Sequence, residues 1–426
     1  MSRIEALQGW IDARFPLTSM WKEHIAEYYA PKNFNFWYYF GSLALLVLVM
    51  QILTGIFLTM NYKPDAASAF ASVEYIMRDV SWGWLIRYMH STGASMFFVV
   101  VYLHMFRGLM YGSFRAPREL VWVVGVVIYL ALMAEAFMGY LLPWGQMSFW
   151  GAQVIVNLFS AVPFIGPDLS LWIRGDYVVS DATLNRFFAF HVIALPIVLL
   201  GLVVVHIIAL HEVGSNNPDG VDIKKLKDSK TGRPLDGIPF HPYYTVKDMV
   251  GATVFLIVFS AIVFFAPEMG GYFLEANNFI PADPLKTPEH IAPVWYFTPF
   301  YSVLRAVPPM FGSQFPGVAV MGAAVLILFA VPWLDRSPVR SIRYRGPLFK
   351  RALAVFIVAF VVLGYLGIKP TGVWGIMPEG IPLLGGAPVA TVVAQLCTLI
   401  YFAFFLAMPW YTARDTYKPV PERVTA

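Results

Sequence analysis

The chain has little charge and almost no cysteine. Of its 426 residues 13% are charged and 58% are hydrophobic, whereas about a quarter of a soluble domain is charged. This balance excludes an ordinary soluble protein and indicates an integral membrane protein. The single cysteine, Cys397, lies in the apolar run VVAQLCTLIYFAFF. It forms no internal disulfide, and we interpret it as a packing residue.

Other features are also missing. No C-x-x-C-H motif occurs, which excludes covalent attachment of a c-type haem. The first 32 residues are polar and amphipathic and lack the pattern of a cleaved signal peptide, so we expect none to be removed. No internal repeat and no composition break indicates a separate soluble domain, and no nucleic-acid partner is expected.

Long apolar runs are abundant instead. A helix needs about 20 apolar residues to cross a bilayer, and only helices or closed barrels satisfy their backbone groups in lipid. We therefore predict an all-α integral membrane protein with eight transmembrane helices. The predicted spans are roughly 36–60, 82–110, 121–141, 185–210, 248–266, 317–334, 351–368 and 388–410.

Lysine and arginine are distributed unevenly between the two sides. The N-terminus, 107–118, 212–247, 335–351 and the C-terminus hold 22 of the 30. The positive-inside rule places these segments, and both termini, in the cytoplasm, which we call the n-side. The opposite p-side has two long connections, 142–184 and 267–316, which are rich in proline, glycine and aromatic residues. We expect short amphipathic surface helices there.

Four histidines lie inside predicted spans at related intervals. His90 and His104 are 14 residues apart on the second span, and His191 and His206 are 15 apart on the fourth. On an α-helix, side chains 14 and 15 residues apart point to within about 40° and 60° of the same direction. The two histidines of each span are therefore on roughly one face, at two levels roughly 21 Å apart along the axis. We expect the two spans to be antiparallel, with His90 and His191 near their p-side ends. Two facing histidine pairs are typical of bis-histidine b-type haem ligation.

Glycines repeat the same interval. Gly41 and Gly55 on the first span, and Gly125 and Gly139 on the third, are each 14 apart. Glycine allows a flat group to approach the backbone, although small residues also serve helix packing. Arg87 and Arg107 each lie three residues from a histidine. They are placed to pair with haem propionates, or to extend toward the interface as ordinary flanking residues.

Two other classes of protein are alternatives. A transporter with an intramembrane histidine and glutamate proton relay would contain no haem, so absorption bands on reduction distinguish it. A di-haem membrane anchor of a dehydrogenase is shorter and lacks the long p-side loop that ends in WYFTPF. Any one of the histidines alone is better explained as a satisfied core residue than as a ligand.

Longer motifs resemble a known family. RYMHSTGASMFF, GYLLPWGQMSFWGA, RFFAFH, LHEVGSNNPDG, HPYYTVKD and WYFTPFYSVLR resemble the cytochrome b subunit of quinol–cytochrome c oxidoreductases, from about residue 30 to the last span. The resemblance implies an N-terminal segment 1–32, a di-haem four-helix bundle 33–211, a cytoplasmic loop 212–247, a C-terminal four-helix region 248–410 and a tail 411–426.

The resemblance also implies a function. Quinol is oxidised at a p-side pocket, and one electron passes to a Rieske iron–sulfur protein and a membrane-anchored c-type cytochrome. The other passes through two non-covalent b haems and reduces quinone at an n-side pocket. His90 and His191 would bind the p-side haem, and His104 and His206 the n-side haem. A homodimeric complex in a bacterial inner membrane, surrounded by the lipid bilayer, is implied as well.

The same resemblance implies two quinone pockets. The n-side pocket would contain His211, Ser215, Lys247 and Asp248, whose histidine and acid can deliver protons to a quinone. The p-side pocket would contain Phe137, Tyr140, Gly151, Pro293, Trp295, Tyr296 and Tyr301.

Two positions depart from the family pattern. Many relatives have 14 residues between the histidines of the fourth span, and here Pro196 lies within a 15-residue interval, so we predict a local wide turn. Most relatives also have Pro-Glu-Trp-Tyr at the p-side pocket, whereas this chain has Val294 in place of the glutamate. Valine cannot accept a proton.

Glu135 is the acid that stands out. It lies in the apolar stretch VVGVVIYLALMAEAFMGYLLPWG, where an acid costs roughly 3 kcal/mol. It precedes Gly139 by one turn, about 6 Å, so we expect it near the p-side haem and the quinol pocket. It is either the proton acceptor that Val294 cannot be, or a protonated residue that only hydrogen-bonds a neighbouring helix. Glu268 and Glu289 are rival acids, explained by ordinary solvation near the p-surface.

Overall fold

The computed structural model describes residues 2–22, 26–310, 312–369 and 389–425. Within them eight helical segments are long and apolar enough to cross a membrane, which confirms the eight predicted spans. They are Phe36–Thr59, Gly83–Tyr111, Glu119–Leu141, Asp181–Val213, Tyr243–Phe265, Phe315–Leu334, Pro347–Ile368 and Val389–Leu406. Most of the predicted p-side connection 369–387 lies outside the described residues.

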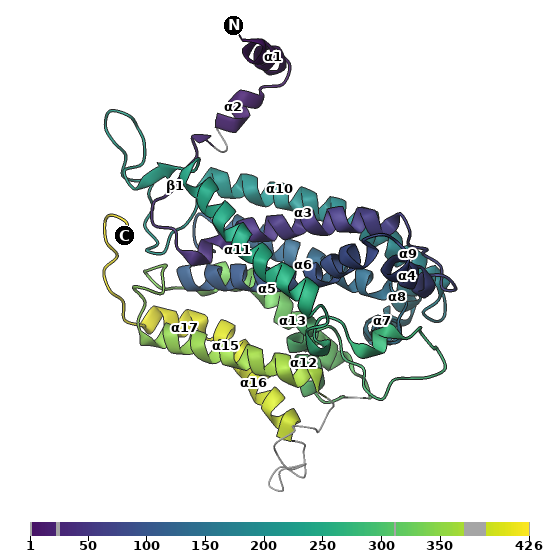
Figure 1. The fold of residues 1–426 in the computed structure, drawn as a ribbon. Coiled ribbons are helices and arrows are strands. Elements are labelled where there is room, and N and C mark those ends of the chain that lie inside the picture. The colour runs from purple at the N-terminus through teal and green to yellow at the C-terminus, as the bar shows by residue number, and fades with distance from the viewer. Residues whose placement is uncertain (1, 23–25, 311, 370–388, 426) are drawn as a thin grey trace.

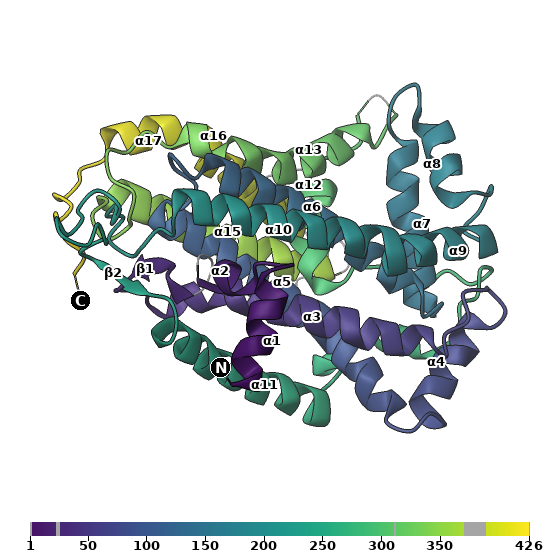
Figure 2. The same cartoon turned by 90° about the horizontal axis from the view of Figure 1, so that it is seen from above.

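The first four spans contain the helices of a bundle. They are α3 (Tyr39–Thr59), α5 (Gly83–Tyr111), α6 (Glu119–Leu141) and α10 (Leu195–Val213). α3 packs on α5, and α6 packs on α10, as Figures 1 and 2 show. The expectation that the second and fourth spans are antiparallel is wrong. Both run from the p-side to the n-side, because exactly one intervening span, α6, returns the chain between them.

The second group of helices lies beside this bundle. It consists of α11 (Tyr243–Phe265), α13 (Phe315–Leu326), η7 (Ile327–Ala330), α14 (Val331–Leu334), α15 (Pro347–Ile368), α16 (Val389–Leu406) and α17 (Met408–Arg414). Asp415, just after α17, caps the start of α15, where it accepts hydrogen bonds from the backbone N–H groups of Leu348 and Phe349 at 3.2 and 3.0 Å.

Short helices cover the p-side end, as predicted for its long connections (Figure 2). The first connection holds α7 (Gln146–Ser160) and α8 (Gly166–Arg174), and α9 (Asp181–Ala189) begins the fourth span. The second holds η4 (Met269–Gly271), η5 (Ala276–Phe279), η6 (Trp295–Phe297) and α12 (Thr298–Ala306). A further helix, α4 (Ala69–Arg78), was not predicted.

The opposite end joins the segments that are rich in lysine and arginine. Strands β1 (Tyr29–Pro31) and β2 (Gly237–Pro239) pair antiparallel, with Ala30 opposite Ile238. Helices α1 (Arg3–Asp12) and α2 (Leu17–Trp21) belong to the N-terminal segment, and η2 (Phe36–Tyr38) begins the first span. Helices α1 and α2 stand out from the body of the molecule in Figure 1.

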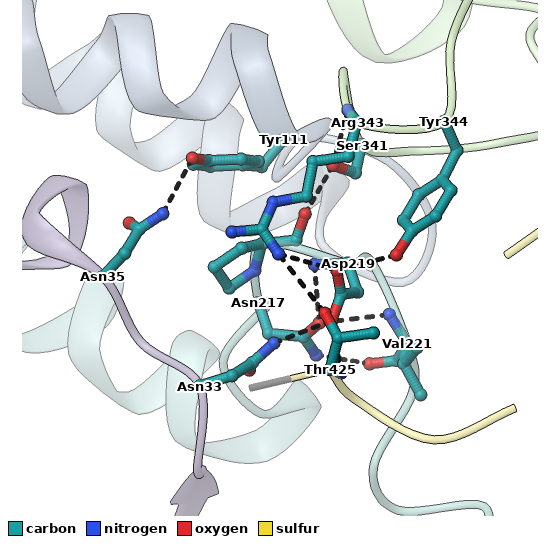
Figure 3. A network of polar contacts seen from close by, with 11 residues as sticks. Asn33, Asn35, Tyr111, Asn217, Asp219, Val221, Ser341, Arg343, Tyr344 and Thr425 are labelled. Atoms are coloured by element: carbon teal, nitrogen blue, oxygen red, sulfur yellow. Dashed lines mark hydrogen bonds and ion pairs between the residues drawn. The ribbon is translucent and has the colours of Figure 1, made fainter. Parts of the chain in front are cut away.

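Asp219 is the centre of a polar network at this end (Figure 3). Its buried carboxylate accepts hydrogen bonds from Asn33, Arg343, Tyr344 and Thr425 at 2.8 to 2.9 Å. These partners come from the stretch just before the first span, the connection between α14 and α15, and the C-terminal tail. The segments that the charge distribution assigned to one side therefore meet at one end of the molecule.

The network predicts a pH-dependent stability. Burial alone would raise the pKa of Asp219, but the hydrogen bonds from Thr425, Tyr344 and Arg343 outweigh it and hold the pKa below its ordinary value. Because the pKa is lower in the folded state, the stabilisation is present above pH 4 and is lost as the pH falls through the folded-state value. We expect Asp219→Asn to lower the thermal midpoint by roughly 5 °C at pH 7 and to reduce its acid dependence. The exposed acid Glu422 is the control, and equal midpoints for Asp219→Asn and Glu422→Gln would contradict this role.

Candidate functional site

The four intramembrane histidines form two facing pairs. The ring centres of His90 and His191 are 6.2 Å apart, and those of His104 and His206 are 6.4 Å apart. His90 and His104 come from α5. His191 lies in the π-helical turn η3 (Phe190–Ala194), and His206 lies on α10. The structure thus brings together the pairs that the sequence predicted.

The turn η3 accommodates the 15-residue interval. It is a π-helix, which takes about one residue more per turn than an α-helix, and it ends two residues before Pro196. Proline has no N–H to offer the carbonyl of Val192 four residues earlier, so a regular α-helical hydrogen bond is impossible there. The extra residue is absorbed in this turn, and the predicted wide turn is confirmed.

Each glycine at the 14-residue interval lies against one histidine. A Cβ added to Gly41 would meet Cε1 of His104 at 3.4 Å, and one added to Gly55 would meet Cε1 of His90 at 3.3 Å. On α6, Gly125 faces His206 in the same way, and a Cβ on Gly139 would overlap the His191 ring, with Nδ1 only 2.8 Å away. The glycines therefore leave room beside both histidine levels.

The histidine pairs fit a metal bound between them. Two metal–nitrogen bonds of about 2 Å each, added to the distance from each nitrogen to its ring centre, come close to the observed separations between ring centres of 6.2 and 6.4 Å. Nδ1 of His90 is 2.9 Å from Thr54 Oγ1, and Nδ1 of His191 is 2.9 Å from the carbonyl oxygen of Glu135. Both rings thereby leave Nε2 for a metal. The described residues contain no group of three or more His, Cys, Asp or Glu that could hold a metal, and a pair of imidazoles is a ligand set that a haem iron accepts.

Arg107 also fits an anionic group at the n-side level. One of its terminal nitrogens lies 3.4 Å from Nδ1 of His104, and its guanidinium lies over the ring of Tyr38. Nε of Arg107 is buried and has no hydrogen-bond partner among the described residues, which is unusual for a buried donor. A haem propionate matches this donor. Arg87 lies on α5 one turn before His90 and is partly buried.

Glu135 contacts the p-side histidine pair. Its Oε1 is 3.0 Å from Nδ1 of His191, and Oε2 is buried without a hydrogen-bond partner among the described residues. The structure thus places Glu135 beside a candidate metal ligand, as its spacing from Gly139 predicted. A carboxylate at Nδ1 orients the imidazole and makes it more basic.

Aromatic side chains surround the predicted quinol segment. Val294 is buried, Trp295 donates from Nε1 to Ser95 Oγ at 3.1 Å, and the Tyr296 ring stacks on Phe98 at 3.9 Å between centres. Gly151 lies against the ring of Tyr140, since an added Cβ would be 3.5 Å from Cε1.

The remaining predicted p-side residues lie around this segment. Phe137 packs on Phe187 at 5.4 Å, Tyr301 lies under the guanidinium of Arg305, and Pro293 is partly buried. Sequence reasoning missed Glu275, which accepts a hydrogen bond from the Tyr140 hydroxyl at 3.0 Å. Its surrounding sequence carries no motif that singles it out.

The predicted n-side residues fall into two contact groups. His211 stacks on Tyr28 at 4.4 Å, and the Tyr28 hydroxyl is 2.9 Å from Ser215 Oγ. Asp248 contacts Ser42 of α3, and the ammonium of Lys247 lies 4.5 Å from the centre of the Tyr243 ring. Tyr28 was missed because it precedes the recognisable motifs.

Comparison with known proteins agrees with this geometry. The family model for cytochrome b/b6/petB matches residues 25–214, and that for cytochrome b(C-terminal)/b6/petD matches residues 281–402. A cytochrome b of Allochromatium vinosum is 65% identical over 98% of each chain. One of Rhodospirillum rubrum is 48% identical over 98% of this chain and 95% of the relative.

A solved structure shows the same fold. A chain of a structure titled "Hyperthermophilic respiratory Complex III" matches with a TM-score of 0.84 and 38% identity, covering 96% of this chain and 99% of that one. The family models and the relatives together cover both helical groups. The chain belongs to the cytochrome b family of multi-pass, haem-binding membrane proteins.

Proposed function

We propose that the chain is the haem-bearing subunit of a proton-motive quinol–cytochrome c oxidoreductase. The observation that carries this proposal is the arrangement of four histidines as two facing pairs, about 21 Å apart along the helices. His90 and His191 hold one b-type haem, and His104 and His206 hold the other. When bound, the two haems supply one-electron redox chemistry at two depths of the membrane.

The protein residues position the other groups. Gly41, Gly55, Gly125 and Gly139 leave space for the flat macrocycles, and Arg87 and Arg107 bind their propionates. Quinol occupies the p-side pocket formed by Phe137, Tyr140, Gly151, Pro293, Trp295, Tyr296 and Tyr301. Quinone occupies the n-side pocket, where His211, Ser215 and Lys247 bind it and Asp248 supplies a proton.

The proposed assembly follows from the two pockets. A Rieske iron–sulfur protein and a membrane-anchored c-type cytochrome receive one electron from each quinol at the p-side, and the working complex is a homodimer. The 38%-identical match in a respiratory complex III structure supports this assembly. Lysine and arginine gather at the end that holds Asp219, which supports cytoplasmic termini in a bacterial inner membrane.

The proposal is tested with the intact complex purified from its native membrane. Quinol addition is expected to reduce both b-type haems, seen as sharp absorption bands, and to reduce added cytochrome c. A preparation that contains this chain but shows no haem bands would contradict the proposal, as the transporter alternative predicts.

Glu135 gives a separate prediction. Its carboxylate oxygen Oε1 lies 3.0 Å from His191 Nδ1, where a negative charge favours the more positive, oxidised iron. We therefore expect Glu135→Gln, which keeps the size and an acceptor, to raise the midpoint potential of the p-side haem by roughly 60 mV, a tenfold change in equilibrium. The n-side haem serves as the internal control. Unchanged potentials of both haems would show that Glu135 does not act on His191.

A further inference from the structure

The p-side pocket lacks an acid where the family pattern has one, and the structure supplies one from another segment. Val294 is buried at the start of the Val294–Trp295–Tyr296 segment. Glu275 lies just before η5, some twenty residues earlier in the chain. Its carboxylate reaches Tyr140, a residue of the proposed quinol pocket, whose hydroxyl donates to Oε2 at 3.0 Å.

Glu275 also acts electrostatically on the second pocket tyrosine. The pKa of Tyr296 is raised, mainly by burial and then by the charge of Glu275. The titratable groups that face Glu275 are therefore Tyr140 of α6 and Tyr296 of η6, while Asn278 of its own segment is a neutral hydrogen-bond partner. No described lysine, arginine or histidine is among these partners.

The segment that carries Glu275 is held firmly against the start of α7. Gly145 bridges to Pro281, the Ser148 N–H donates to Asn278 Oδ1 at 2.8 Å, and the Gln146 N–H donates to the Ile280 carbonyl at 3.0 Å. A Cβ on Gly145 would lie 2.5 Å from Asn278 Oδ1, so glycine is required for this approach. The motif GYLLPWGQMSFWGA thus holds the segment of Glu275 in place and also lines the proposed quinol pocket.

The environment of Glu275 suits proton transfer near neutral pH. Burial raises the pKa of Glu275 to about 7, while its hydrogen bonds with Tyr140 and Asn278 oppose this rise. A carboxylate with such a pKa is partly ionised at the working pH and both accepts and releases protons readily.

We propose that Glu275, acting through the hydroxyl of Tyr140, accepts one of the two protons that quinol loses at the p-side pocket. This proposal rests on the proposed function. The quinol O–H bond breaks and its proton passes to the Tyr140 oxygen, while the Tyr140 proton passes to Glu275 Oε2. Tyr140 is unchanged overall and Glu275 becomes a neutral acid. The two electrons leave to the iron–sulfur protein and the p-side haem, and the second quinol proton leaves with the electron that goes to the iron–sulfur protein. Glu275 then releases its own proton on the p-side.

The other acids of this end are placed less well. Glu135 contacts His191, which suits a role in positioning that ring. Glu268 and Glu289 are exposed, and neither forms a hydrogen bond with a pocket tyrosine in the described part of the chain. Glu275 is the acid bonded to a pocket residue.

The test compares Glu275→Gln, Tyr140→Phe and the exposed control Glu289→Gln in the purified complex. Glutamine keeps the size of Glu275 and an acceptor for Tyr140 but takes up no proton at these pH values. Quinol oxidation is measured from pH 5.5 to 9, together with the spectra and potentials of both haems. Infrared difference spectra on quinol addition report the C=O band of a newly protonated carboxylic acid.

We expect the wild-type and Glu289→Gln rates to rise with pH through about 7. In Glu275→Gln the rate falls at least tenfold, this rise is lost, and the carboxylic acid band disappears while both haem spectra remain. Tyr140→Phe shows the same loss of rate. Wild-type rates and pH dependence in Glu275→Gln, a uniform fall that keeps the pH dependence, or a retained band would each overturn the proposal. Wild-type complex that fails to oxidise quinol would instead contradict the proposed function.

Discussion

Replacing His191 with leucine is expected to remove the p-side haem and to reduce quinol oxidation at least a hundredfold. His191 faces His90 at 6.2 Å between ring centres, and leucine offers no nitrogen to a metal. The n-side pair His104 and His206 is untouched, so its absorption band is expected to remain. Reduced-minus-oxidised spectra of the purified variant measure both haems separately.

His241→Leu is the matched control, because His241 is exposed and lies outside both pairs. It is expected to keep both haems and the wild-type rate. Retention of the p-side haem in His191→Leu would contradict the assignment of this pair. A variant that fails to fold would lose both haems and would show no thermal unfolding transition. His206→Leu then supplies the reciprocal case, with loss of the n-side haem alone.

Gly139→Val is expected to have the second largest effect. Its added Cβ would overlap the His191 ring, with Nδ1 at 2.8 Å and Nε2 at 2.9 Å, so the ring must move out of line with His90. Overpacking of this kind costs roughly 1–3 kcal/mol, and we expect the p-side haem content to fall at least tenfold. Haem content per chain measures the result.

Gly201→Val provides the comparison on α10. A Cβ on Gly201 has no atom within 4 Å among the described residues, although it also lies in the membrane. In Gly41→Ala the added Cβ makes an ordinary 3.4 Å contact. Normal haem content in both Gly201→Val and Gly41→Ala would show that the Gly139 effect is steric. Equal losses in Gly139→Val and Gly201→Val would contradict the argument.

Much of the fold could be predicted because the signals were periodic or compositional. Apolar runs located all eight spans, and the 14-residue intervals identified the faces of α3, α5 and α6 that meet the histidine levels. The wide turn at η3 followed from one extra residue next to Pro196. These features depend on helix geometry alone, which sequence spacing reports directly.

The missed features depend on contacts between distant segments. Glu275 meets Tyr140 across 135 residues of chain, and Tyr28 meets Ser215 across 187. The strand pair β1 and β2 is only three residues long on each side, so it leaves no alternating pattern to detect. The prediction that the second and fourth spans are antiparallel was wrong, because a single intervening span makes two alternate spans run in the same direction. Glu135 was placed correctly beside the p-side level by its spacing from Gly139, but its contact with His191 required coordinates.

The central claim is that two histidine pairs hold two b-type haems at different depths. A potentiometric titration of the purified complex, combined with haem and protein quantification, tests it most directly. The account predicts two b-type haems per chain that titrate as two separate one-electron components, with only the p-side component shifted in Glu135→Gln. One haem per chain, or a single component that is unaffected by this substitution, would contradict it.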